Sequence, residues 1–112
     1  MSVQVAIGNA SYRQALRDLL VRSGNWEVLL VDEPDPAREG VIVLDSEHLR
    51  RLPRPLPCPE CIVLVARNDP AQMSKAWAAG IHSVVSEKDP LSTTLLAIMS
   101  AGLRSPAHAR RN

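Results

Sequence analysis

The chain has 112 residues and a formal net charge of +1, with 46% hydrophobic and 22% charged residues. This length fits one domain with a real core, and the near-zero charge excludes a global basic field for binding nucleic acid. No signal peptide is visible, and no apolar run approaches the roughly 18 residues of a membrane span. Two cysteines without a signal favour a reducing compartment over a disulfide scaffold. We therefore expect a cytoplasmic protein without membrane contact.

Five short apolar segments alternate with helical patterns, which is typical of parallel β-α-β units. They are rich in Val and Ile, and the middle ones are apolar on both faces, as in strands covered by helices on both sides. The segments are residues 3–7, 26–31, 41–44, 61–66 and 82–85. Trp26 begins the second segment, a predicted edge strand, and is expected to pack under the first helix.

Three helices are indicated by capping residues and terminal glycines. Ser11 with Gln14 fits a capping box, and Asp69 and Asp89 each precede a proline, the pattern of an N-cap followed by the first helical residue. The expected ends are Gly24, Gly80 and Gly102. The second helix is expected to bury Met73, Ala76 and Trp77.

Two connections lack the pattern of a full crossover helix. Residues 33–40 are short and rich in proline, and residues 46–60 allow at most two turns before a series of prolines. We therefore predict reduced second and third crossover helices.

Several strings, in this order, resemble the receiver domains of response regulators, particularly those of LuxR-type transcriptional regulators. VIVLD (41–45) resembles the third strand and places Asp45 as the phosphoacceptor. The other matching strings are IVLVARND (62–69), AWAAGIHSVVSEKDP (76–90) and LLAIMSAG (95–102). The resemblance covers residues 3–104.

This resemblance implies an α/β fold with a doubly wound, five-stranded parallel sheet in the flavodoxin-like receiver order 2-1-3-4-5. Residues 1–103 would form the receiver-like domain, and residues 104–112 a polar tail or truncated linker. Any DNA binding would belong to an output domain that is absent from this chain.

The family's catalytic positions are mostly replaced. Acids after the first strand normally hold the magnesium ion that neutralises the phosphoryl group, but Gly8 and Asn9 stand here. Val65 replaces a phosphate-binding Ser or Thr, and Glu87 replaces a lysine, with Lys88 one residue late. The resemblance therefore implies a pseudo-receiver with only Asp45 retained, and no metal, cofactor or enzymatic activity.

Asp45 has alternative roles. It would cap a loop through backbone N–H groups, or form an ion pair with Lys88 or Arg67. In the competing hypothesis it is phosphorylated with the help of a metal site built from Asp32 or Glu33.

Cys58 and Cys61 form a CPEC motif, which allows a thiol-redox module as a further alternative. A redox or zinc site is disfavoured because the pair leads into a strand, where Cys61 fits a buried small apolar residue. The histidines at 48, 82 and 108 show no ligand spacing and are interpreted as isolated.

The resemblance also implies that residues 69–103 carry a protein partner or self-association, because receivers usually signal through the corresponding face. The candidates for an apolar patch there are Trp77, Ile81, Val84 and Leu103. The expected function is an atypical regulator of two-component signalling or transcription that acts by protein contact, as a homodimer, without phosphorylation.

Overall fold

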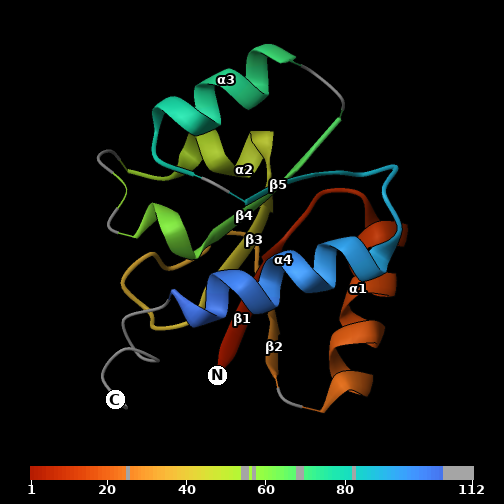
Figure 1. The fold of residues 1–112 in the computed structure, drawn as a ribbon. Coiled ribbons are helices and arrows are strands. Elements are labelled where there is room, and N and C mark those ends of the chain that lie inside the picture. Colours follow the sequence, from red (N-terminus) through yellow and green to blue (C-terminus); the bar gives the residue numbers. More distant parts are fainter. Residues whose placement is uncertain (25, 54–55, 57, 68–69, 82, 105–112) are drawn as a thin grey trace.

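The computed structural model describes residues 1–24, 26–53, 56, 58–67, 70–81 and 83–104. Its centre is a five-stranded parallel sheet with the order β2-β1-β3-β4-β5 (Figure 1). The strands are β1 (Ser2–Ala6), β2 (Glu27–Leu30), β3 (Val41–Asp45), β4 (Ile62–Ala66) and β5 (Ser83–Ser86). The predicted fold class and strand order are confirmed.

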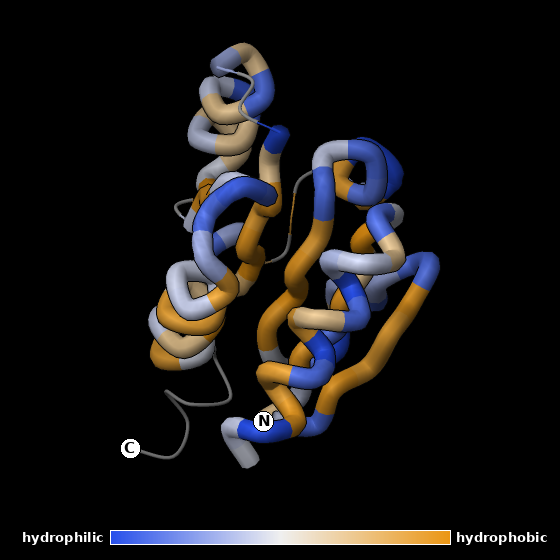
Figure 2. Tube along the Cα trace, turned by 90° about the vertical axis from the view of Figure 1, so that its right-hand side faces the viewer, coloured by the Kyte–Doolittle hydropathy of each residue, from blue (hydrophilic) through white to orange (hydrophobic). Residues whose placement is uncertain are grey.

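The helices lie on both faces of the sheet, as the apolar character of both strand faces predicts (Figure 1). They are α1 (Ala10–Ser23), α2 (Ser46–Arg51), η1 (Pro59–Cys61, a 3-10 turn), α3 (Pro70–Ala78) and α4 (Leu91–Leu103). Alternate residues of β3 serve the two cores: Val43 packs with α1 and α4, whereas Leu44 packs with α2 and α3. Figure 2 shows the strands as mainly hydrophobic, between helices of mixed character.

Both reduced crossovers are confirmed. Residues 31–40, all of them described, form no helix between β2 and β3, and α2 has only 6 residues. Gln4 of β1 is buried and holds the helix-free connection. Its Nε2 donates to the Asp35 carbonyl at 2.9 Å, and its Oε1 accepts from the Asp35 N–H at 2.8 Å. In the described part of the chain, no helix is both long and apolar enough to span a bilayer.

The caps differ from the prediction in two places. Asn9, and not Ser11, caps α1 by accepting from the N–H of Tyr12, because the helix begins two residues earlier than a Ser11 cap would imply. Asp89 does not cap α4; its carboxylate accepts from the N–H of Ser86 and fixes the preceding turn. Gly24 ends α1 in the left-handed conformation as predicted. Asp69 lies outside the described residues.

Of the two tryptophans, Trp77 differs from expectation and Trp26 packs under α1 as expected. Trp77 was expected in the core, but α3 turns Ala76 inward and leaves Trp77 58% exposed. Trp26 packs on the core face that α1 and α4 share, and α4 approaches it directly. A Cβ atom at Gly102 would lie 3.1 Å from Cη2 of Trp26. Because Gly102 has no side chain, α4 packs closely against Trp26 at this point. The prediction that the helix ends at Gly102 is wrong, since it continues to Leu103.

Candidate functional site

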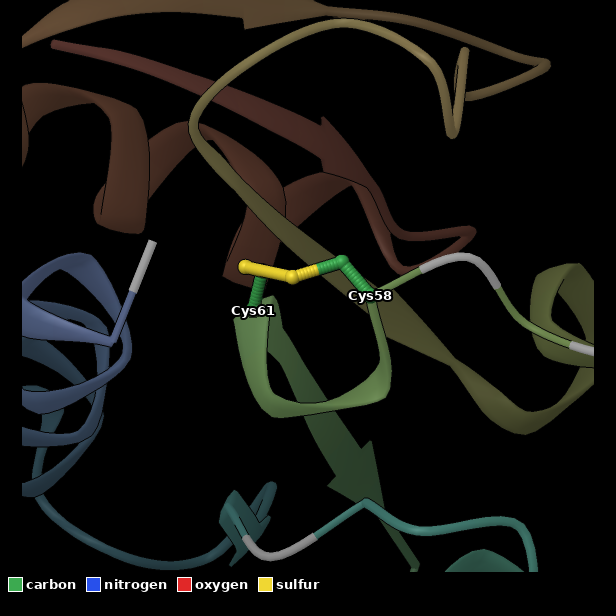
Figure 3. The surroundings of a disulfide bond; sticks show 2 residues. All are labelled: Cys58 and Cys61. Atoms are coloured by element: carbon green, nitrogen blue, oxygen red, sulfur yellow. A yellow bond between two sulfur atoms is a disulfide. The ribbon is translucent and has the colours of Figure 1, made fainter. Parts of the chain in front are cut away.

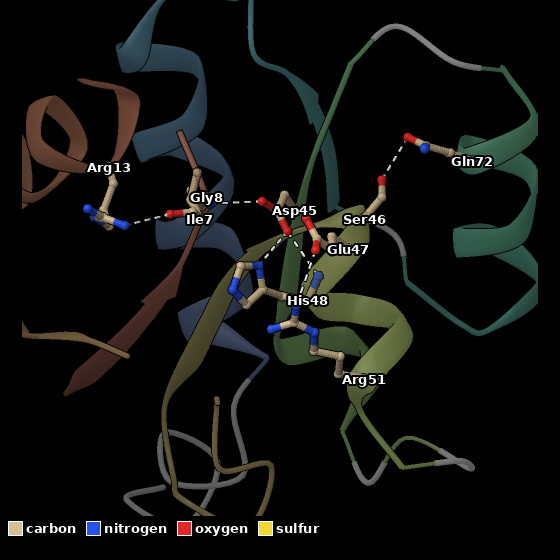
Figure 4. Close-up of polar contacts among 9 residues, drawn as sticks. All are labelled: Ile7, Gly8, Arg13, Asp45, Ser46, Glu47, His48, Arg51 and Gln72. Carbon is tan, nitrogen blue, oxygen red and sulfur yellow. Dashed lines mark hydrogen bonds and ion pairs between the residues drawn. The ribbon is translucent and has the colours of Figure 1, made fainter. Parts of the chain in front are cut away.

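Asp45 occupies the junction between β3 and α2, at the carboxyl end of a central strand. Its Oδ1 accepts from the N–H of His48 at 3.0 Å and thereby caps α2, while its Oδ2 accepts from the N–H of Gly8 at 2.9 Å (Figure 4). Gly8 follows β1, so the carboxylate joins the ends of two neighbouring strands. Asp45 thus has the backbone-capping role that the sequence offered as one alternative.

His48 adds a third contact to this carboxylate. Its Nδ1 lies 2.6 Å from Oδ1 of Asp45, and the residue is only 9% exposed. Burial of Asp45 opposes its ionisation, but the hydrogen bonds from Gly8 and His48 outweigh that effect and hold the pKa of Asp45 below its ordinary value. The sequence interpretation of His48 as isolated is therefore wrong. The available signal was its position three residues after a helix-capping aspartate.

A small polar cleft of about 170 Å³ lies beside Asp45. The amide of Asn9 donates to Glu87 across it, and Nε of Arg67 lies 3.4 Å from Oε2 of Glu87. Val65 is the neighbour of Asp45 in the β3–β4 register and presents a buried apolar side chain to the site. Most of the replaced positions identified in the sequence therefore do come together around Asp45.

The alternative role of Asp45, an ion pair with Lys88 or Arg67, is not observed. Among the described residues, the carboxylate bonds to Gly8 and His48 instead, because α2 brings the imidazole to it from three residues away. Arg67 is engaged by Glu87, and the backbone N–H of Lys88 donates to the Ser86 hydroxyl.

The side chains around Asp45 do not fit a magnesium ion. Magnesium requires oxygen ligands in near-octahedral geometry, whereas both oxygens of Asp45 accept hydrogen bonds and the Asn9 amide is bonded to Glu87. Within the described ranges, no three His, Cys, Asp or Glu side chains are grouped to hold a metal. Asp32 and Glu33 are exposed and do not line the cleft, so the alternative metal site that they would build is not formed.

Comparison with known proteins identifies the fold that carries the Asp45 cleft. The sequence matches no protein-family model and no curated protein. Among solved structures, the chain is similar to a signal receiver domain of two-component signal transduction (histidine kinase) from Clostridium thermocellum, with a TM-score of 0.65 and 10% identity. The likeness covers 89% of this chain and 95% of that chain. The chain has the fold of a receiver domain. In the receiver fold, as in other open α/β sheets, ligand sites lie at the carboxyl ends of the strands, where Asp45 stands here.

The two cysteines of this receiver fold lie remote from Asp45, on the approach to β4. Cys58 and Cys61 form a disulfide across η1 (Figure 3). The expectation of two reduced cysteines is therefore corrected: the 3-10 turn brings the sulfur atoms together. Cys61 is buried, as predicted.

The surface of the receiver fold expected to bind partners is made by α3, β5 and α4. Trp77 and Leu103 are 58% and 65% exposed. Ile81 is fully buried in the core between β4 and α3, so the prediction that it contributes to the surface is wrong. Val84 is half-buried and packs against the same core. Leu96 and Met99, which the sequence interpretation did not select, are exposed on α4.

Proposed function

We propose that the chain is a pseudo-receiver, a non-enzymatic regulatory domain of a two-component-type signalling or transcription regulator related to the LuxR type. It acts in the cytoplasm by protein contact, without phosphorylation. DNA binding, where it occurs, belongs to a separate output domain.

The state of the Asp45 carboxylate carries this proposal. A carboxylate that accepts a phosphoryl group needs a cation and hydrogen-bond donors to neutralise the charge of the transferred group. Here its oxygens already bond to Gly8 and His48. The neighbouring Val65 offers no donor, and Glu87, which stands where the family has a lysine, is paired with Arg67. Attack on a phosphoryl group would have to break existing bonds without a metal to replace them.

Phosphorylation is tested by incubating the protein with acetyl phosphate and magnesium chloride and measuring its intact mass. We expect the unmodified mass, whereas a functional receiver domain in the same reaction should gain one phosphoryl group. A stoichiometric phosphorylated species that is lost in Asp45→Ala would contradict the proposal.

The same experiment decides the competing function, a phosphorylatable receiver that uses Asp45 as acceptor. The position of Asp45 at the carboxyl end of a central strand, in a polar cleft, favours that alternative. Tight binding of beryllofluoride with magnesium at Asp45 would also support it.

Self-association is the contact that we assign to this domain. α4 contains no Asp, Glu, Lys or Arg, and its exposed side chains include Leu96, Met99 and Leu103. Two copies that meet through the same face bring identical charges together, so a helix without charges is suited to a symmetric contact. The burial of exposed apolar side chains would supply the driving force.

Light scattering at high micromolar concentration tests this contact. We expect a dimer that Leu96→Lys converts to a monomer. Val21→Lys provides a matched control, because Val21 is an exposed apolar residue on another helix, α1. A strictly monomeric wild-type protein, or equal effects of both substitutions, would contradict the assignment to α4.

A further inference from the structure

We propose that the Cys58–Cys61 disulfide is a redox-active site that exchanges with an external dithiol at Cys58 and controls the packing of the turn that ends α3. This site lies apart from the Asp45 cleft and does not depend on the pseudo-receiver function.

The backbone keeps the two cysteines opposed independently of the sulfur–sulfur bond. Their Cα atoms are 5.5 Å apart, within the range that disulfides require. The N–H of Cys61 donates to the carbonyl of Cys58 at 3.0 Å, and the N–H of Ile62 donates to the carbonyl of Pro59. Because these bonds persist after reduction, the thiols stay close enough to form the disulfide again, whereas the covalent restraint on the motion of η1 is lost.

The two sulfur atoms differ in access. Cys61 is 4% exposed and leads into β4, whereas Cys58 is partly exposed at the start of the turn (Figure 3). Since thiol–disulfide exchange requires a thiolate to reach a sulfur atom, the incoming reductant attacks Cys58.

The exchange is a two-electron reduction by a dithiol. One thiolate of the dithiol forms a bond with Sγ of Cys58 while the Cys58–Cys61 bond breaks, and the electron pair goes to Sγ of Cys61, which takes a proton. The second thiolate of the dithiol then attacks the first dithiol sulfur. This step releases Cys58, which takes the second proton, and leaves the dithiol as its own disulfide.

Pro59 connects this turn to α3. A Cβ atom at Gly80 would lie 3.1 Å from Cγ of Pro59, so the proline ring packs directly on the turn that ends α3. The N–H of Gly80 donates to the carbonyl of Trp77, and the N–H of Ile81 donates to that of Ala76. η1 also contacts α4. A change in the freedom of η1 therefore acts on the end of α3.

The proposed compartment fits such a role. Disulfides that form in a reducing cytoplasm are commonly transient and serve catalysis or redox sensing, whereas structural disulfides belong to oxidising compartments. Only this fit rests on the proposed cytoplasmic location; the geometry of the two cysteines is independent of it.

The first experiment measures whether the bond is reducible in the folded protein. The oxidised full chain is incubated with dithiothreitol without denaturant and quenched with acid, and its free thiols are then alkylated in denaturant and counted by mass. We expect two alkyl groups per chain, and restoration of the disulfide by oxidised glutathione. A bond that dithiothreitol reduces only when denaturant is present during the reduction would be purely structural and would overturn the proposal.

The second experiment compares the two sulfur atoms. Cys61→Ser leaves Cys58 as the single thiol, and Cys58→Ser leaves Cys61. We expect the thiol of Cys61→Ser to react with an aromatic disulfide reagent at least about tenfold faster, because reactivity follows exposure. Equal rates in two folded variants would overturn the assignment of Cys58 as the entry point.

Hydrogen exchange of the wild-type protein tests the coupling and needs no variant. Reduction should accelerate exchange at the amides of Gly80 and Ile81, while the amides of β1 remain unchanged. Identical exchange at residues 80–81 in both redox states would show that the disulfide does not control the end of α3.

Discussion

Oδ1 of Asp45 receives both the backbone N–H and the ring nitrogen of His48, at 3.0 and 2.6 Å. Asp45 thus caps α2, and the residue whose N–H it accepts, His48, also covers the carboxylate with its imidazole. Because the N–H of Gly8 donates to the other oxygen, the carboxylate ties together the carboxyl ends of β1 and β3 and is part of the local structure there.

The first prediction concerns the contribution of Asp45 to the free energy of unfolding, which is lost at acid pH. Its pKa is lowered in the folded state, because the hydrogen bonds outweigh the effect of burial. Its ionised form therefore stabilises the fold above the unfolded pKa of about 4, and this contribution is lost as the pH falls through the lower folded value. Asp45→Asn keeps a capping oxygen but does not titrate. We expect the wild type to exceed Asp45→Asn in free energy of unfolding at pH 6, and the difference to shrink towards pH 3.

Urea denaturation at several pH values measures this difference. Glu47→Gln is the matched control, because Glu47 lies in the same helix and is exposed. It should produce only a small change. A difference between wild type and Asp45→Asn that is independent of pH would contradict the prediction.

The second prediction concerns a buried brace between α1 and α4. The hydroxyl groups of Tyr12 and Thr94 lie 2.7 Å apart, and Thr94 is fully buried. Tyr12→Phe leaves the Thr94 hydroxyl without this partner, so we expect a loss of about 1–2 kcal/mol in the free energy of unfolding. Thr94→Val should cost a similar amount. In a double-mutant cycle the two losses should not add, and full additivity would show that the contact contributes nothing.

The sequence predicted the sheet well because its signal is local. Each strand is a short segment that contains Val or Ile, and the crossover between β2 and β3 is visibly too short and proline-rich for a helix. The caps were less predictable: Asn9 and Ser11 are both good capping residues, and only the tertiary position of α1 selects between them. Trp77 looked like a core residue, but the register of α3 places the smaller Ala76 inward.

The site was predictable in position but not in its contacts. The strings that resemble receiver domains assigned Asp45, Val65 and Glu87 to one site, and all three line the cleft. They did not indicate that His48 would bond to Asp45; the signal for that contact was the position of the histidine three residues after a helix-capping aspartate. The disulfide was not predicted, because the lack of a signal peptide bears only on the redox environment of the protein. Whether the two sulfur atoms meet depends on the 3-10 turn between Cys58 and Cys61, which the sequence did not indicate.

The third prediction compares two glycines with positive φ. At Gly40, with φ of 122°, a Cβ atom would lie 2.2 Å from the carbonyl oxygen of Ser2. At Gly24, with φ of 79°, it would meet nothing within 4 Å. Gly24→Ala should therefore cost about 1 kcal/mol of backbone strain, and Gly40→Ala about 3 kcal/mol or more, because the clash adds to the strain. Thermal unfolding of both variants measures this, and equal losses would contradict it.

The fourth prediction concerns the stability that the disulfide provides. The loop that it closes is short, because the two cysteines are 3 residues apart. The chain-entropy relation gives about 2 kcal/mol for such a loop. We expect the reduced wild type and the Cys58→Ser/Cys61→Ser variant to lose the same modest amount in urea denaturation while remaining folded. Unfolding on reduction would contradict this.

The attachment of the helix-free crossover at Gln4 has a consequence for local opening. A crossover helix is held by many side chains, whereas this connection is fixed to β1 by a few bonds: both backbone groups of Asp35 bond to Gln4, and the carbonyl of Glu39 accepts from the hydroxyl of Ser2. If these bonds and the ion pair between Arg38 and Glu27 open, residues 32–40 detach together while the ladders from β1 to β2 and β3 stay paired. The domain thus contains a small cooperative unit whose release costs far less than global unfolding.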